Sequence, residues 1–225
     1  MTPEELSETR LLPSFDDRLC TIPDFLPLEM FVSLQAEILR LVETDRSYVP
    51  GHKKGATIGY EALRRSGPKI VAFYQSAQHR RFISRIVGAQ LEPTPMHDNS
   101  SLSILIYDQP GDHIGWHYDH NFYRGRHFTV LIGIENTDPS NTAPSQARLL
   151  VKNSNGEAVD IPTPPNTLVV FEGAMHRHKV TPLGKGERRV MLSMTYCTNP
   201  KNSRGQELAR RVKDTAYFGI RALWR

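Results

Sequence analysis

Short apolar runs separated by polar turns dominate the chain after Pro95. The runs are rich in β-branched and aromatic residues, and Gly, Pro, Asn and Asp fall between them. They read SLSILIY (101–107), RHFTVLIGIEN (126–136), ARLLVK (147–152), NTLVVFEG (166–173) and RRVMLSMTY (188–196). Short strands at such intervals are typical of a β-sandwich or barrel, so we expect a double-sheet core over residues 96–200.

Residues 1–95 show a helical period instead, and we expect them to support the core. After Pro27, apolar residues recur every three or four positions, as in a helix that packs one face on a core. They are Phe31, Leu34, Ile38 and Leu41. A second helix, with Ser76 as its N-cap, carries Phe82, Ile83, Ile86 and Val87. The predicted fold class is mainly β with flanking helices.

Three segments lack these signals. Residues 1–20 have no clear period and are expected to form a loose arm. The segment 48–68 is rich in Gly and basic residues, which favours a long loop that could hold a short strand and close over a site as a lid. The tail, residues 201–225, is predicted to be helical over 203–213. With no internal repeat, we expect a single domain over the whole chain.

Composition excludes several classes of protein. Hydrophobic residues make up 39% and charged residues 23%, which is ordinary for a globular domain. No apolar run approaches the ~20 residues that a membrane span needs. The N-terminus is acidic and polar, unlike a secretory signal. Cys20 and Cys197 are too few for a disulfide framework, so we expect a cytoplasmic protein that does not insert into membranes.

The net charge of +4 is concentrated at one end of the chain. Residues 201–225 hold seven basic and two acidic side chains, so the remainder is close to neutral at −1. A basic tail can contact nucleic acid. More often such a tail is a solvated helix face, and we favour that interpretation.

The stretch GWHYDH (115–120) contains the strongest chemical signal. In an extended chain, residues i and i+2 point to the same face, so His117 and Asp119 would project together. A third ligand is offered by His178, which begins HKVTP 59 residues after Asp119. Two His and one carboxylate can hold Fe(II) on one face and leave the other positions open. A zinc hydrolase would usually also have a Glu base in the motif, and neither segment supplies one.

These motifs resemble those of the 2-oxoglutarate- and Fe(II)-dependent dioxygenase superfamily, over about residues 99–196. The resemblance rests on His117-x-Asp119, on HKVTP and on RRVMLSMTY. It implies a double-stranded β-helix (a jelly roll, cupin-like) with Fe(II) as the metal. It further implies 2-oxoglutarate as co-substrate, O2 as oxidant and ascorbate as a supporting reductant in assays. In that pattern the distal His is followed by x-Val-x-Pro, which favours His178 over its neighbour His176 as the third ligand.

The same resemblance implies an Arg or Lys about ten residues later that binds the distal carboxylate of 2-oxoglutarate. Alternation puts Arg189, Met191, Ser193 and Thr195 on one face of a strand and Arg188 with apolar residues on the other. The mixed face suits a lined pocket, so we favour Arg189 over Arg188. Ser193 could add a hydroxyl. Tyr107, ten residues before His117, matches a family Tyr whose hydroxyl reaches 2-oxoglutarate.

The reaction and substrate are suggested by Asp119 and the segment after it. Related halogenases have Gly or Ala at the carboxylate position to admit chloride, so Asp119 favours hydroxylation. NFYRGRHFTVLIGI (121–134) resembles free-amino-acid halogenases and their hydroxylase relatives. This implies a small polar substrate such as an amino acid or its derivative, with release of succinate and CO2. The candidate substrate-binding residues are Asn121, Tyr123, Arg124, Arg126, Ser103 and Tyr60, with Arg64 beside Tyr60 in the lid.

Three alternatives stay open. A protein or peptidyl hydroxylase would share the helices and core. A nucleic-acid demethylase would use the basic tail and flip a base into the pocket. Against it, VMLSMTY lacks the further Arg that demethylases carry after the co-substrate Arg. A non-catalytic cupin-like binding module would bind iron weakly or not at all. The sequence leaves the oligomeric state open.

Overall fold

The computed structural model describes residues 12–45, 47–49 and 53–201, and it consists mainly of antiparallel strands. The strands are β1 Leu19–Ile22, β2 Ser47–Val49, β3 Lys53–Ile58, β4 Glu92–Pro93, β5 Leu102–Tyr107, β6 His113–His117, β7 His127–Thr137, β8 Leu149–Lys152, β9 Ala158–Ile161, β10 Leu168–Phe171, β11 His178–Val180 and β12 Arg188–Cys197. The helices are α2 Leu28–Thr44, α3 Tyr60–Ser66, α4 Pro68–Gln75 and α5 Ala77–Val87. All five predicted runs contain a strand, and the two helices predicted within residues 1–95 both form.

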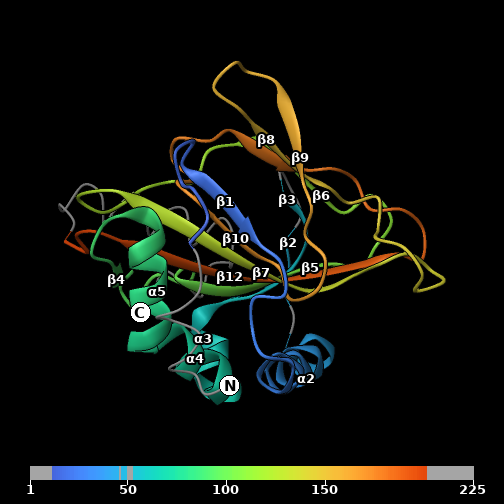
Figure 1. Cartoon of the computed structure of the whole chain (residues 1–225). Helices are drawn as coiled ribbons and strands as arrows, with labels where there is room; N and C mark the ends of the chain where they lie inside the picture. The colour runs from blue at the N-terminus through green and yellow to red at the C-terminus, as the bar shows by residue number, and fades with distance from the viewer. Residues whose placement is uncertain (1–11, 46, 50–52, 202–225) are drawn as a thin grey trace.

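The strands make two facing sheets that are joined at one side (Figure 1). The major sheet has the order β1-β10-β7-β12-β5, and the minor sheet has the order β6-β11-β8-β9. Strand β3 pairs with β5 of the major sheet and with β6 of the minor sheet, so it connects the two. This nearly closed, barrel-like arrangement with flanking helices confirms the predicted jelly-roll core.

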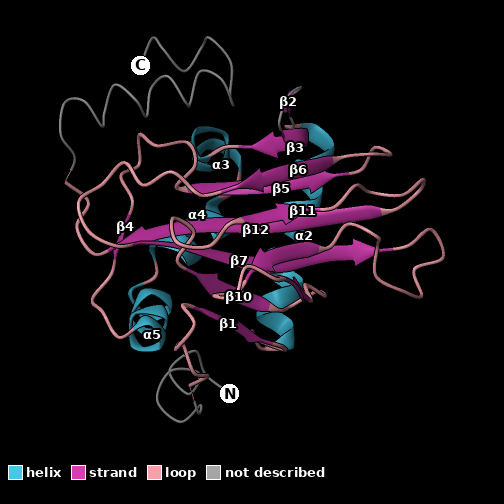
Figure 2. Cartoon of the chain, turned by 90° about the horizontal axis from the view of Figure 1, so that it is seen from above, coloured by secondary structure: helices cyan, strands magenta, loops and turns pink. Residues whose placement is uncertain are grey.

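The helices cover the outer face of the major sheet, and Figure 2 shows them beneath the long strands. The buried face of α2 belongs to the same hydrophobic core as Val190, Leu192 and Met194 of β12. On α5, the Ser76 hydroxyl accepts a hydrogen bond from the His79 amide, which satisfies a free N–H of the first turn. Helix α5 ends at Gly88 in the left-handed conformation (φ 64°), which glycine adopts at little cost.

The segment 48–68 holds the short strand that the sequence allowed, but the long loop predicted around it is wrong. Strand β2 pairs with β3, and α3 begins at Tyr60, so most of the segment is regular structure. Its apolar positions Ile58, Tyr60 and Leu63 are fully buried, and this burial favours strand and helix over a solvated loop. Because β3 is hydrogen-bonded on both sides, it cannot swing open as a lid without breaking sheet bonds.

The described end of the N-terminal arm differs from the expected loose chain, because Leu19 and Cys20 pair with Phe171 and Val170 of β10. Cys20 and Cys197 are buried and free of disulfides. The helix predicted over 203–213 lies outside the described residues. Among the helices described, none has the length and apolarity that a membrane crossing requires.

Candidate metal centre and co-substrate site

A cavity of about 180 Å³ lies between the two sheets and is lined by both. Its wall from the major sheet includes Tyr107, Thr129, Arg189, Met191 and Ser193, and its wall from the minor sheet includes Ile114, His117 and His178. The alternation of β12 therefore works as predicted, with Arg189, Met191, Ser193 and Thr195 facing the cavity.

His117, Asp119 and His178 converge on this cavity, with their ligand atoms all within 4.8 Å of one another. Strands β6 and β11 pair with His117 directly opposite His178, which brings the two ring centroids to 4.1 Å. Asp119, two residues beyond the end of β6, places Oδ1 3.7 Å from His117 Nε2 and 3.6 Å from His178 Nε2. Two imidazoles and one carboxylate on one face are the donor set that suits non-haem Fe(II).

Backbone contacts orient both imidazoles for a metal. The Nδ1 atom of His117 lies 2.8 Å from the Gly115 carbonyl, and that of His178 lies 2.9 Å from the His176 carbonyl. A carbonyl can only accept, so each Nδ1 carries the hydrogen and each Nε2 presents its lone pair toward Asp119. The geometry therefore fits a metal on the Nε2 side of both rings.

Asp119 is held from two directions. Its backbone N–H donates to the Gly173 carbonyl (3.0 Å), and its Oδ2 accepts from the Thr129 hydroxyl. A Cβ at position 173 would lie 2.0 Å from Oδ2, so only glycine leaves room for this carboxylate. Burial acts to raise the pKa of Asp119, but the positive charge that the imidazoles of His178 and His117 carry when protonated, together with the Thr129 hydroxyl, outweighs it and lowers the pKa. The carboxylate is thus ionised and ready to bind a cation.

Arg189 is a buried cation at the cavity wall, with 1% of its surface exposed. Within the described residues its hydrogen bond runs from Nη2 to Thr163 Oγ1 (3.3 Å), and its Nε has no partner. The guanidinium lies 5.4 Å from the centroid of the Tyr107 ring. Burial lowers the pKa of Arg189 and raises that of Tyr107. A buried guanidinium without a carboxylate partner is costly, which favours an anionic ligand in the cavity.

The two rival residues lie elsewhere. Arg188 points away from the cavity and forms ion pairs with Glu43 (2.9 Å) and Glu135 (3.3 Å). His176 lies outside the triad, with its Nε2 2.8 Å from the carbonyl of Asp17 and its Nδ1 3.3 Å from that of Lys152.

The predicted substrate residues separate into two groups. Ser103 lines the cavity, as does the predicted co-substrate residue Ser193. The others do not line it: Asn121, Tyr123, Arg124, Arg126, Tyr60 and Arg64. Tyr60 is buried in the helical layer, where its hydroxyl accepts from Gln75 Nε2 (2.8 Å) and its ring contacts Tyr74.

The four remaining residues build the turn that follows Asp119. The side chain of Asn121 bonds the Gly125 carbonyl (2.7 Å) and the Tyr123 amide (2.9 Å). The Arg124 amide donates to Lys201, and the Arg126 side chain pairs with Glu172. The side chains of Asn121 and Arg126, which the sequence suggested for a substrate, are thus engaged within the protein, whereas the contact of Arg124 is made by its backbone.

Polar residues that sequence reasoning missed line the cavity near the outer end of β5. Asp98 is 3% exposed, accepts from the Tyr123 hydroxyl (2.7 Å) and lines the cavity together with Ser100 and His127. Asp98 lies in a turn before a strand, where an acidic residue is ordinary, so no local pattern marked it. The Asp98 turn reaches the cavity because the Ser101 amide donates to Asp98 and the Ser101 carbonyl accepts from Thr195.

Comparison with protein families agrees with this site. A model described as Halogenase D matches residues 7–124, and a model of the 2OG-Fe(II) oxygenase superfamily matches residues 102–197. The chain therefore belongs to the 2OG-Fe(II) oxygenase superfamily and to its Halogenase D-like members, since the latter model covers more than half of it. It is a 2-oxoglutarate-dependent dioxygenase, whose cofactors are Fe(II) and 2-oxoglutarate.

Solved structures show the same fold at low sequence identity. A Pseudomonas putida prolyl-4-hydroxylase has a TM-score of 0.60 at 17% identity, over 83% of this chain and 95% of its own. A Trichoplax adhaerens prolyl hydroxylase in complex with a hypoxia-inducible-factor peptide scores 0.64 at 16% identity, over 86% and 87%. The epimerase SnoN, in complex with Fe3+, α-ketoglutarate and nogalamycin RO, scores 0.65 at 12% identity, over 80% and 79%. No curated protein matches the sequence.

Proposed function

We propose that this enzyme hydroxylates an unactivated C–H of a small polar molecule, such as an amino acid or its derivative, and releases succinate and CO2. One observation carries the proposal. The donor atoms of His117, Asp119 and His178 line the same cavity as the buried guanidinium of Arg189, which pairs with no carboxylate of the residues that the structure describes. A metal-binding face and an anion-binding group in one enclosed space are what an Fe(II) and 2-oxoglutarate pair requires.

The residues of the chain would act by binding and orienting. His117, Asp119 and His178 would hold Fe(II), which supplies the oxidation chemistry together with 2-oxoglutarate and O2. Arg189 would bind the distal carboxylate of 2-oxoglutarate through its planar fork. Tyr107, whose ring lies against that guanidinium, and Ser193, on the same face of β12, would line the co-substrate.

Asp119 supports hydroxylation in a chain that matches a halogenase model. Its carboxylate occupies the space between the two imidazoles and Gly173, and the Thr129 hydroxyl bonds its second oxygen. A halide ligand would need that coordination position, which this carboxylate fills. We therefore assign the chain to the hydroxylating members of its family.

The far end of the cavity supports a substrate that carries a cationic amine. Arg189 and Thr195 are six residues apart on β12, so the cavity floor runs for about 20 Å between them. Asp98 lies at the Thr195 end, where its buried carboxylate would attract an ammonium group. In this proposal the anionic co-substrate would bind beside Arg189 at one end of the cavity, and the cationic substrate would bind beside Asp98 at the other.

A peptidyl hydroxylase is the second candidate, because two of the similar structures are prolyl hydroxylases and one of them holds a peptide. A peptide substrate would thread past the cavity and leave most of its length outside. A free amino acid would lie inside the cavity, with its ammonium group close to Asp98. The two classes therefore differ in how strongly turnover depends on Asp98.

Succinate formation would test the proposal. Purified enzyme, Fe(II), ascorbate, 2-oxoglutarate and air would be combined with free amino acids and derivatives, with peptides, or with methylated single-stranded oligonucleotides. We expect amino acids to stimulate succinate release and the Asp119→Ala and Arg189→Ala variants to abolish it. Stimulation by peptides alone would favour the second candidate. Absence of Fe(II) and 2-oxoglutarate binding without air would reject the assignment of the site.

A further inference from the structure

Glu172 is a buried carboxylate outside the cavity, and the proposed chemistry does not use it. It follows the last residue of β10 and is 5% exposed. It does not line the cavity, yet it lies next in sequence to Gly173, the residue whose carbonyl and missing side chain both accommodate Asp119. A buried ionised carboxylate is stable only when it is paired. The partners of Glu172 therefore indicate which segments of the chain it connects.

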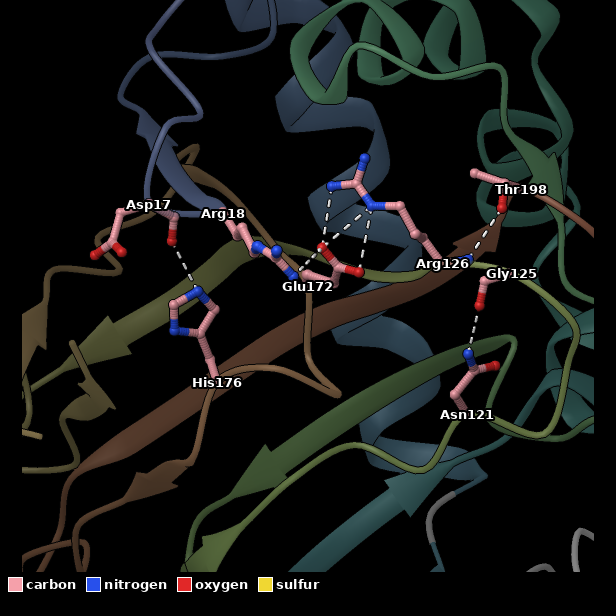
Figure 3. A network of polar contacts seen from close by, with 8 residues as sticks. All are labelled: Asp17, Arg18, Asn121, Gly125, Arg126, Glu172, His176 and Thr198. Carbon is pink, nitrogen blue, oxygen red and sulfur yellow. Dashed lines mark hydrogen bonds and ion pairs between the residues drawn. The ribbon is translucent and has the colours of Figure 1, made fainter. Parts of the chain in front are cut away.

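Arg126 is the first partner (Figure 3). Its Nε lies 3.3 Å from each carboxylate oxygen of Glu172, and its Nη2 lies 3.0 Å from Oε2. The Arg126 amide donates to the Thr198 hydroxyl (3.0 Å) and the Arg126 carbonyl accepts from the Thr198 amide (3.0 Å), just beyond β12. Gly125, at φ 102°, lets the chain pass there, because a Cβ would lie 2.3 Å from the Thr198 hydroxyl. The guanidinium is thus anchored to the major sheet before it reaches Glu172.

Arg18 is the second partner and comes from the N-terminal arm. Its Nη1 lies 3.5 Å from Glu172 Oε2, and its carbonyl accepts the Glu172 amide (3.1 Å). Next to it, the carbonyl of Asp17 lies 2.8 Å from His176 Nε2. The arm therefore contacts both ends of the turn 172–176 (Figure 3).

That turn contacts two of the three residues assigned to the metal. The Gly173 carbonyl accepts the amide of Asp119 (3.0 Å), and the His176 carbonyl lies 2.9 Å from Nδ1 of His178. The Glu172 carbonyl accepts the amide of His176 (3.2 Å), which closes the turn. A shift of Glu172 would therefore move the hydrogen-bond acceptors that orient both Asp119 and His178.

We infer that Glu172 is a positioning residue, which Arg126 and Arg18 clamp in place so that the turn 172–176 holds Asp119 and His178 in metal-binding geometry. We call these three residues the Glu172 clamp. The inference rests on the proposed metal-binding roles of Asp119 and His178. It assigns Arg126, a sequence-level candidate for substrate binding, to the support of the metal site.

Hydrogen exchange of the metal-free protein would test the clamp without iron. Glu172→Gln keeps the size and one oxygen of the side chain but removes its charge, and Glu172→Ala removes the group. We expect both variants to speed exchange over residues 119–126 and 172–178, with Glu172→Ala the stronger. Asp160→Asn and Asp160→Ala are matched controls, since Asp160 forms an exposed ion pair with Arg148 in the minor sheet (3.5 Å). Unchanged exchange in both Glu172 variants would overturn the inference.

Anaerobic titration would then measure the effect on the metal. We expect Glu172→Ala to weaken Fe(II) affinity by about 10- to 100-fold, as is typical when support of a metal ligand is lost. Glu172→Gln should weaken Fe(II) affinity less, and the Asp160 variants should leave it unchanged. The visible charge-transfer band of the Fe(II)–2-oxoglutarate complex should shift or broaden in the Glu172 variants. The KM for 2-oxoglutarate should stay near the wild-type value, because Arg189 lies on β12, away from the clamp.

A double-mutant cycle would identify the partner. Arg126→Gln and Glu172→Gln should each weaken Fe(II) binding. The double variant should lose little more Fe(II) affinity than either single variant. Additive losses would reject the pairing of Arg126 with Glu172. If wild type bound no Fe(II), the proposed function would fail, while the exchange experiment would still decide whether the clamp orders the two segments.

Discussion

The two sheets that face the cavity hold their functional groups in different ways. In the major sheet, β7 and β12 are buried along nearly their whole lengths, with helices on one face and the cavity on the other. In the minor sheet, β6 is half-buried throughout and β9 is mostly exposed. Arg189 extends from an internal strand of the major sheet, whereas Asp119 lies beyond the end of β6 and His178 begins a three-residue strand.

The difference reflects what binding of 2-oxoglutarate and binding of a metal each require. A buried guanidinium requires a dry, rigid wall, and the major sheet supplies one through close packing. The proposed metal ligands require correct orientation of three side chains. Hydrogen bonds to carbonyls orient the two imidazoles of the minor sheet, while Thr129 of β7 and Gly173 just beyond β10 hold Asp119 from the side of the major sheet. Variants of the triad should therefore affect metal binding first, and variants of Arg189 should affect 2-oxoglutarate binding first.

The largest effect should come from the metal wall. Asp119→Ala removes the only carboxylate of the described triad, and we expect turnover to fall by more than about 1,000-fold because two imidazoles hold the metal poorly. Mn(II), as a redox-stable probe, should raise the Tm of wild type and not that of the variant. His178→Ala should behave like Asp119→Ala, whereas His176→Ala should keep metal binding. If Mn(II) failed to stabilise His176→Ala but still stabilised His178→Ala, His176 and not His178 would be the third ligand.

The next largest effect should come from the opposite wall. Arg189→Gln should raise the KM for 2-oxoglutarate by about 100-fold, since charge-assisted hydrogen bonds to the carboxylate are lost. The Mn(II)-induced rise in Tm should remain. Without ligand, the variant should be at least as stable as wild type, because a buried charge without a carboxylate partner has been removed. Arg188→Gln is the matched control, and an equal rise in its KM would contradict the separation of the two residues.

A smaller effect is expected at the end of the cavity that neither ligand occupies. Asp98→Asn should raise the KM for a cationic substrate by about tenfold and leave the KM for 2-oxoglutarate and Mn(II) binding unchanged. Measured against a neutral analogue of the same substrate, the effect should disappear. A rise in the KM for 2-oxoglutarate instead would show that Asp98 acts on the co-substrate and not on the substrate.

The smallest effect is expected at Ser193. Ser193→Ala removes one hydroxyl from the cavity face of β12, and a single neutral hydrogen bond corresponds to about a two- to tenfold change in affinity. We expect that change in the KM for 2-oxoglutarate, measured by succinate release. An effect as large as that of Arg189→Gln would show that Ser193 does more than line the wall.

Local patterns predicted much of the site because the relevant geometry is local. The two-residue spacing of His117 and Asp119 brings their side chains together wherever the strand lies. The alternation of β12 separates Arg189 from Arg188 in the same way, since opposite faces of one strand meet different environments. The 48–68 segment was mispredicted because Gly and basic residues suggested a loop, whereas burial of Ile58, Tyr60 and Leu63 makes it strand and helix.

Local sequence patterns were enough to predict the class of core, the His-x-Asp pair and the face of β12 that meets the cavity. Each of these predictions follows from short apolar runs or from a two-residue spacing. The pairing of the remaining charged side chains depends on the tertiary structure. Arg126 pairs with Glu172, 46 residues away, and Asp98 reaches the cavity through contacts around Ser101. Such pairings depend on how distant strands are aligned in the sheet, and that alignment follows from burial across the whole molecule and not from any local pattern.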